Sequence, residues 1–133
     1  MNRILVIDDE EVVRLVVGEI LSRAGYSVKT VGDSREGLAL LRQESYDLLI
    51  TDLLMPETDG LETIMTLRRQ HKSLRIMVIS GCDLTLGGEY LKIAQRLGAD
   101  CALAKPFTQA SLLQAVEALL GRPEKLTSQT PAT

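Results

Sequence analysis

Short runs of apolar, mostly β-branched residues alternate along the chain with segments whose apolar residues recur every three or four positions. The first run covers residues 3–7, Arg-Ile-Leu-Val-Ile, and leads directly to Asp8. An apolar run without polar alternation is typical of a strand buried on both faces. Similar runs predict further strands, and together the expected strands cover residues 3–7, 26–31, 47–51, 75–79 and 101–104.

The segments that follow these runs have the period of amphipathic helices. In the first, Val12, Val16 and Ile20 recur every fourth residue, and Gly25 follows as a residue that can end a helix with a positive φ. Three segments begin with a residue that favours the N-cap position. The expected helices, with these N-cap residues, cover about residues 12–24, 33–44 (Asp33), 59–70 (Asp59), 88–97 and 108–120 (Thr108).

Five strand–helix units with short connections predict a parallel α/β sheet covered by helices on both faces. The chain has 133 residues, of which 45% are apolar, and this suits one domain with one packed sheet. We expect that domain to span residues 1–121. Residues 122–133 are rich in Pro, Thr, Ser and Gln without an apolar period, which predicts a disordered tail or a linker.

Charge and composition exclude several classes of function. The formal net charge of −3 gives the domain no electrostatic reason to bind nucleic acid directly. No apolar run approaches the roughly 20 residues of a membrane-spanning helix, and the first residues do not resemble a signal peptide. Cys82 and Cys101 match neither a CxxC pair nor a zinc site. We therefore expect a cytoplasmic protein with reduced cysteines.

Polar residues are concentrated where the expected strands end. In an open parallel sheet, ligands bind at the carboxyl ends of the strands, where the strand order reverses. The residues at these ends are Asp8, Asp9 and Glu10 after the first strand, Asp52 after the third, Ser80 after the fourth and Lys105 after the fifth.

Three aspartates at one edge require positive charge nearby. Two like charges about 4 Å apart repel by roughly 4 kcal/mol at an effective dielectric constant near 20. Lys105 offers one counter-charge, and a Mg²⁺ ion bound to carboxylates and phosphate oxygens would offer another. Any single aspartate could instead serve as a helix cap or turn residue. The combination with Ser80 and Lys105 favours a binding site.

Several motifs now carry a resemblance to a known family. They are Asp8-Asp9-Glu10, the segment 52–60 (Asp-Leu-Leu-Met-Pro-Glu-Thr-Asp-Gly), Ser80-Gly81, Gly98-Ala99-Asp100 and Lys105-Pro106-Phe107, in this order. Over residues 3 to about 120 the chain resembles the receiver domains of two-component response regulators, the chemotaxis regulators among them. The resemblance implies a doubly wound, flavodoxin-like fold with a five-stranded parallel sheet of order 2-1-3-4-5.

The resemblance also implies roles in phosphoryl transfer. Asp52 matches the phosphoacceptor, a carboxylate nucleophile. Lys105 matches the lysine that pairs with the phosphoryl oxygens, and Ser80 the switch hydroxyl that moves to hydrogen-bond the phosphoryl group. Pro106 would follow a cis peptide bond.

A Mg²⁺ site belongs to the same pattern. Asp9 matches a direct Mg²⁺ ligand, and Asp8 matches the carboxylate that binds the ion partly through water. Asp52 and the backbone carbonyl of Leu54 complete the implied ligand set.

The function implied is a phosphorylation-controlled signalling switch rather than a turnover enzyme. The phosphoryl group would come from a histidine kinase or a phosphotransfer protein. An output partner would contact the face formed by the fourth helix, the fifth strand and the fifth helix. Two alternatives stay open. One is a haloacid-dehalogenase-type phosphatase, which requires a second Asp where this chain has Leu54. The other is a pseudo-receiver that acts without phosphorylation.

The chain departs from the family pattern at two positions, 102 and 54. Ala102 stands where the family usually has Tyr or Phe, so a coupled rotation of an aromatic ring with Ser80 is not expected. Leu54 is apolar and cannot orient a hydrolytic water by hydrogen bonding, which predicts slow self-dephosphorylation. Elsewhere, Met55, Met65 and Met77 are expected to pack in the core.

Overall fold

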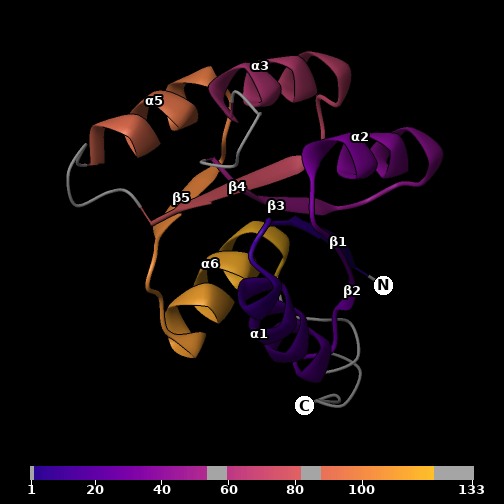
Figure 1. The fold of residues 1–133 in the computed structure, drawn as a ribbon, viewed down its shortest axis with the longest axis vertical. Helices are drawn as coiled ribbons and strands as arrows, with labels where there is room; N and C mark the ends of the chain where they lie inside the picture. The colour runs from indigo at the N-terminus through magenta and orange to yellow at the C-terminus, as the bar shows by residue number, and fades with distance from the viewer. Residues whose placement is uncertain (1, 54–59, 82–87, 122–133) are drawn as a thin grey trace.

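The computed structural model describes residues 2–53, 60–81 and 88–121, which form five strands and five helices (Figure 1). The predicted Asp59 N-cap and the predicted tail at 122–133 lie outside these residues. The strands are β1 (Arg3–Ile7), β2 (Ser27–Val31), β3 (Leu48–Asp52), β4 (Arg75–Ser80) and β5 (Cys101–Ala104). The helices are α1 (Glu11–Arg23), α2 (Ser34–Gln43), α3 (Gly60–Gln70), α5 (Gly88–Leu97) and α6 (Gln109–Leu120).

The strands form one parallel sheet in the predicted order β2-β1-β3-β4-β5. The chain first winds from β1 outward to β2, and then crosses to β3 on the other side of β1. The order of strands therefore reverses between β1 and β3. This is the position at which a doubly wound sheet holds its ligand.

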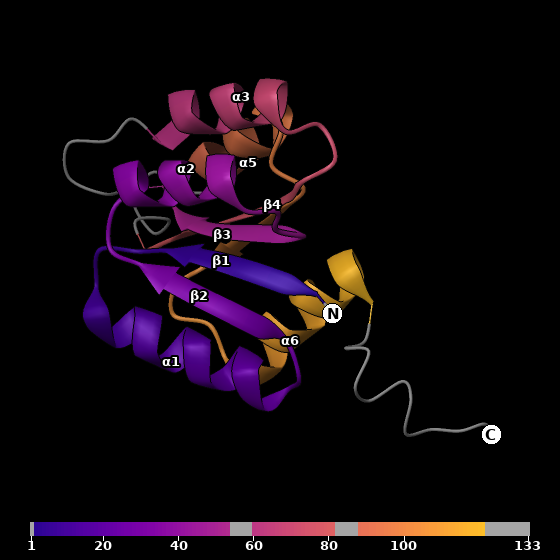
Figure 2. The same cartoon turned by 90° about the vertical axis from the view of Figure 1, so that its right-hand side faces the viewer.

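Helices cover both faces of the sheet. Helices α2, α3 and α5 pack on one face, and α1 and α6 pack on the other (Figures 1 and 2). Successive side chains of a strand point to opposite faces. Leu5 and Ile7 of β1 therefore belong to the core below α2, α3 and α5, whereas Ile4 and Val6 belong to the core with α1 and α6. Burial on both faces explains the unbroken apolar run of this strand.

The predicted helix ends are confirmed where the structure describes them. The Asp33 carboxylate accepts a hydrogen bond of 2.8 Å from the backbone N–H of Glu36, and Thr108 caps α6 in a reciprocal capping box. Gly25 and Gly98 follow α1 and α5 with φ values of 106° and 135°. None of the helices within the described residues is long and apolar enough to cross a membrane.

Two features of burial differ from the expectation. The buried residues of α1 are Val17 and Leu21, while Val12 and Val16 are 70% and 46% exposed. Met77 lies in the core as predicted, but Met65 is 43% exposed on α3, so that prediction was wrong. Ile64 and Leu67 form the face of α3 that packs on the sheet, and Met65 lies outside that face. Its apolar character alone does not bury it. Met55 lies outside the described residues.

Candidate functional site

Main-chain hydrogen bonds hold the candidate residues at the carboxyl edge of the sheet. The Asp8 N–H donates to the Val31 carbonyl over 3.2 Å, which extends the β1–β2 pairing past the end of β1. The Lys105 N–H donates to the Ser80 carbonyl over 2.9 Å and extends β4–β5 pairing in the same way. Asp52 is the last residue of β3 and pairs with β4. The predicted residues Asp8, Asp52, Ser80 and Lys105 are thus brought to one edge by the strands themselves.

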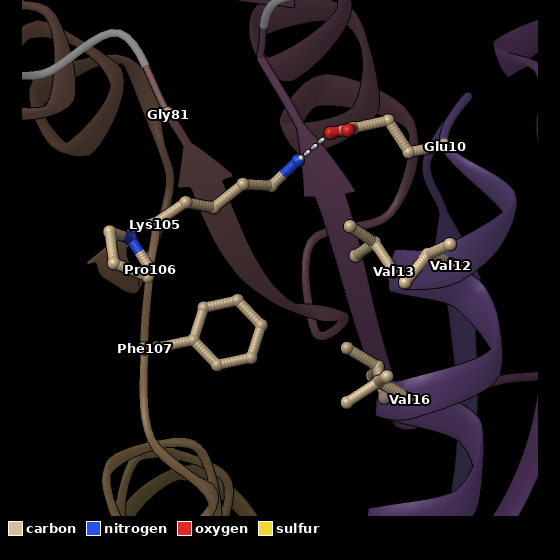
Figure 3. A pocket seen from close by; sticks show the side chains of 9 residues that line it. Glu10, Val12, Val13, Val16, Gly81, Lys105, Pro106 and Phe107 are labelled. Carbon is tan, nitrogen blue, oxygen red and sulfur yellow. Dashed lines mark hydrogen bonds and ion pairs between the residues drawn. The ribbon is translucent and has the colours of Figure 1, made fainter.

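The Lys105 ammonium lies at the centre of three carboxylates. Its Nζ atom is 2.8 Å from Asp52 Oδ2, 2.9 Å from Glu10 Oε1 and 3.0 Å from Asp8 Oδ2. Figure 3 shows the lysine side chain extending from the segment after β5 toward Glu10. Burial lowers the pKa of Lys105, but the contacts with the three carboxylates outweigh it and raise this pKa above its ordinary value. The lysine is therefore a permanent cation.

Asp8 is a fully buried carboxylate with unused acceptor capacity. Its Oδ1 accepts a hydrogen bond of 2.8 Å from the Glu10 N–H. Its Oδ2 forms the ion pair with Lys105, but no hydrogen bond of acceptable direction reaches that atom within the described residues. Burial raises the pKa of Asp8, and the Glu10 N–H and Lys105 limit the rise. A buried acidic oxygen in this condition gains from an additional positive charge.

The acidic residues fit a hard divalent cation. One carboxylate oxygen from each of Asp8, Glu10 and Asp52 lies within 4.8 Å of the others. Oxygen donors of this kind suit Mg²⁺. One ammonium does not neutralise three carboxylates, so the group retains negative charge that a cation would offset. The underused Oδ2 of Asp8 points to the same conclusion.

The structure does not place every predicted residue in this group. Asp9 is exposed and is not one of the three carboxylates that converge, so its role as a ligand stays a prediction. Leu54 lies outside the described residues, and so does its carbonyl. Glu10 was given no role from the sequence, although it completes the acidic run after β1. The predicted cis peptide between Lys105 and Pro106 is confirmed.

An open, mostly apolar hollow of about 450 Å³ adjoins the carboxylates (Figure 3). It lies between α1 and the segment that follows β5, and Val13, Val16 and Phe107 line it. Glu10 and Lys105 line the same hollow, so it is continuous with the acidic group. A molecule in the hollow would therefore lie beside Lys105.

Comparison with known proteins identifies the family. Residues 4–117 match the model of the response regulator receiver domain. The chain belongs to this family.

Among curated relatives, the transcriptional regulatory protein CpxR of Escherichia coli strain K12 is 36% identical over 125 residues, which cover 92% of this chain and 50% of CpxR. The alkaline phosphatase synthesis regulator PhoP of Bacillus subtilis is 35% identical over 124 residues, with coverage of 92% and 50%. The chain spans about half the length of these relatives.

Solved structures agree on the fold. The chemotaxis response regulator CheY4 of Vibrio cholerae has a TM-score of 0.80 at 30% identity, covering 90% of this chain and 98% of CheY4. The Mg²⁺–BeF complex of response regulator TrrA from Thermotoga maritima has a TM-score of 0.79 at 30% identity. The match covers 90% of this chain and 99% of TrrA.

Family and site together define the class of protein. A receiver domain is a phosphoacceptor signalling module and not a turnover enzyme. The acidic pocket of Asp8, Glu10 and Asp52 around Lys105 is of the kind found in phosphoacceptor receivers. These findings support the switch and not the phosphatase alternative.

Proposed function

We propose that this chain accepts a phosphoryl group on Asp52 from a histidine kinase or a phosphotransfer protein. The observation that carries the proposal is the position of Asp52. Its carboxylate is 5% exposed, ends the strand next to the reversal of strand order, and lies 2.8 Å from a lysine ammonium. A carboxylate in that setting can act as a nucleophile whose product is stabilised electrostatically.

In the transfer step, a carboxylate oxygen of Asp52 forms a bond to phosphorus while the nitrogen–phosphorus bond of a phosphohistidine breaks. The imidazole leaves with the bonding electron pair and takes up a proton. Lys105 offsets the negative charge of the phosphoryl oxygens, and such positioning and neutralisation provide most of the catalysis in phosphoryl transfer. The main-chain bond between Lys105 and Ser80 keeps the lysine at the site.

We propose Mg²⁺ as the cofactor. Asp8, Asp52 and Glu10 would hold it by the geometry described above, and the family resemblance adds Asp9 and the Leu54 carbonyl. A bound Mg²⁺ supplies charge neutralisation for phosphoryl oxygens. Asp8 is prepared for that role because its buried Oδ2 lacks a well-directed hydrogen bond within the described residues.

The hollow beside α1 is the proposed docking site for the histidine-bearing helix of the phosphodonor protein. It opens next to Lys105 and Glu10, and the exposed Val12 and Val16 stand on the adjoining face of α1. An apolar helix face packed there would bring its histidine to the edge where Asp52 lies.

The output face proposed from the family consists of α5, β5 and α6. Ala102 in β5 has no ring to rotate, so we propose that phosphorylation acts through the segments after Ser80 and Lys105. Slow self-dephosphorylation follows from the apolar Leu54. Leu54→Asn should shorten the lifetime of the phosphorylated protein, and an unchanged lifetime would contradict this assignment.

The central experiment compares the parent chain with Asp52→Asn. Each is incubated with Mg²⁺ and the small phosphodonor phosphoramidate, and acid-labile phosphorylation is followed by intact mass. We expect one phosphoryl group on the parent and none on Asp52→Asn. Glu11→Gln, at an exposed acidic residue of α1, is the matched control and should behave as the parent. Equal phosphorylation of Asp52→Asn, or none on the parent, would contradict the proposal.

A second experiment tests the docking site. Val12→Glu and Val16→Glu should slow transfer from a phosphorylated histidine protein and leave transfer from phosphoramidate unchanged. Met65→Glu, at an exposed apolar residue of α3, is the control and should leave both rates unchanged. Equal slowing by all three variants would refute docking at the hollow.

A further inference from the structure

Arg14 reaches back from the first turns of α1 to the connection that carries the acidic residues. Its side chain is half-buried, and its Nη1 donates a hydrogen bond of 2.7 Å to the main-chain carbonyl of Asp8. Its own N–H donates to the Glu10 carbonyl over 3.1 Å. We infer that Arg14 is a positioning residue that holds the acidic turn of residues 8–10 in its metal-binding arrangement. This inference rests on the proposed function.

The hydrogen bond fixes more than one atom. The carbonyl of Asp8 and the N–H of Asp9 belong to one planar peptide group, so a donor on the carbonyl also sets the orientation in which Asp9 leaves β1. On the other side of Asp8, its N–H is held by Val31. Both peptide groups that flank Asp8 are therefore anchored, and its side chain is directed into the site.

Arg14 differs from Lys105 in what it contacts. Lys105 meets the carboxylates themselves, whereas Arg14 donates to a main-chain oxygen. A neutral acceptor leaves the carboxylate lone pairs available for a cation. Arg14 can thus order the acidic turn without competing for the oxygens that would bind the metal.

A second contact extends this arrangement to the next connection. A β-carbon at Gly32 would lie 3.1 Å from Nη1 of Arg14 and 3.5 Å from its Cζ. Gly32 follows β2 directly, so the guanidinium that binds the β1–α1 connection also lies next to the β2–α2 connection. The missing side chain at position 32 provides the space for the guanidinium. The β-carbon of an alanine at position 32 would require the guanidinium to move by a few tenths of an ångström.

The test is the affinity for Mg²⁺ measured by isothermal titration calorimetry. Arg14→Met removes the donor but keeps an unbranched chain, and it should weaken Mg²⁺ binding about tenfold. Arg14→Lys retains a donor and should recover part of the affinity. Gly32→Ala replaces neither Arg14 nor any acidic residue, but it should displace the Arg14 guanidinium and so weaken binding by about threefold. Amide NMR shifts of Asp9 and Glu10 should change in all three variants without the ion.

Arg23→Met is the control, because Arg23 lies on the same helix with its side chain 79% exposed. Its Mg²⁺ affinity should equal that of the parent. If Arg14→Met lowers the urea midpoint but binds Mg²⁺ as tightly as the parent, Arg14 is only structural and the inference is wrong. Should Arg14→Met fail to fold, Gly32→Ala and Arg14→Lys decide, and parental affinity in both overturns it. A parent that binds Mg²⁺ and is phosphorylated, with unaffected variants, refutes this inference alone. A parent that does neither refutes the proposed function as well.

Discussion

The two edges of the sheet each carry an aspartate paired with a basic residue, but the pairs are built differently. At the amino edge, Asp100 Oδ2 accepts hydrogen bonds from Arg68 Nη2 over 2.7 Å and from the Ile76 N–H over 2.8 Å. At the carboxyl edge, Lys105 meets three carboxylates at once, and Asp8 Oδ2 still lacks a well-directed hydrogen bond within the described residues.

The difference lies in how completely the polar groups are satisfied. Besides Asp100, the Arg68 guanidinium donates to four main-chain carbonyls, those of Gly98, His71, Lys72 and Leu74. It ties the end of α3 to the connections before β4 and β5. Within the described residues, the Arg68 charge is paired with one opposite charge, that of Asp100, and each guanidinium nitrogen donates a hydrogen bond. The carboxyl edge instead concentrates negative charge, which costs stability and creates capacity for a ligand. The hydrogen-bond network of Arg68 at the amino edge stabilises the fold, whereas the crowded carboxylates at the carboxyl edge form the candidate functional site.

The largest expected effect on stability is at the amino edge. Arg68→Ala leaves several carbonyls and Asp100 without their donor, and should lower the free energy of unfolding by about 3 kcal/mol. The rate of phosphorylation by phosphoramidate in native buffer should stay within about twofold of the parent. Urea unfolding and a phosphorylation time course measure the two quantities. A large loss of phosphorylation with little loss of stability would reverse the roles of the edges.

Removal of the central cation is the next largest change. Lys105→Met leaves three carboxylates without their ammonium and should cost about 2 kcal/mol in Mg²⁺-free buffer. Mg²⁺ should restore part of this, since an ion that binds only the folded state stabilises it. The measurement is the unfolding midpoint with chelator and with Mg²⁺. If Mg²⁺ raises the unfolding midpoint of this variant no more than that of the parent, Lys105 does not neutralise the carboxylates at the carboxyl edge.

Asp8→Asn should raise the free energy of unfolding, whereas the two preceding substitutions lower it. It removes a desolvated charge beside Asp52, so we expect a gain of about 1 kcal/mol without Mg²⁺ and weaker Mg²⁺ binding. The pKa of Asp8 is raised above its ordinary 3.8 in the folded protein. Protonated Asp8 therefore contributes its full stability to the folded protein below pH 3.8. This contribution is lost as the pH rises through the raised pKa.

The gain from Asp8→Asn should accordingly vanish at the acidic end of that range and grow toward neutral pH. Urea unfolding at several pH values in chelator tests this. A variant less stable than the parent at neutral pH would show that the Asp8–Lys105 ion pair outweighs the repulsion.

The smallest effect belongs to an exposed pair. Arg23 and Glu19 form a 2.6 Å ion pair on α1 with side chains 79% and 61% exposed. Arg23→Ala should change the free energy of unfolding by no more than about 0.5 kcal/mol and leave phosphorylation unaffected. A larger loss would mean that a short distance alone determines stability, without regard to burial.

Much of the fold was predictable because burial on both faces makes the central strands β1, β3 and β4 nearly continuous apolar runs. The site followed in part, since Asp8, Asp52, Ser80 and Lys105 all occur where such runs end. Spacing could not show which row of α1 faces the sheet, so the exposure of Val12 and Val16 came from the structure.

Two contacts at the site had no sequence signature. Glu10 joins the group because the Lys105 side chain extends to it, and the length of that reach depends on tertiary packing. Arg14 acts on a main-chain carbonyl, an acceptor that every residue possesses. Side-chain types predict which chemistry is available, but they do not predict a partner in the backbone.

The position of Lys105 separates the folding of this protein from the supply of metal. Small zinc domains remain unfolded until their ion arrives, because nothing else neutralises their ligands. Here the Lys105 ammonium already lies among the acidic groups, so we expect a newly made chain to reach its native state in a magnesium-poor medium. We expect the ion concentration to govern how readily the folded protein is phosphorylated, and not how much of the protein folds.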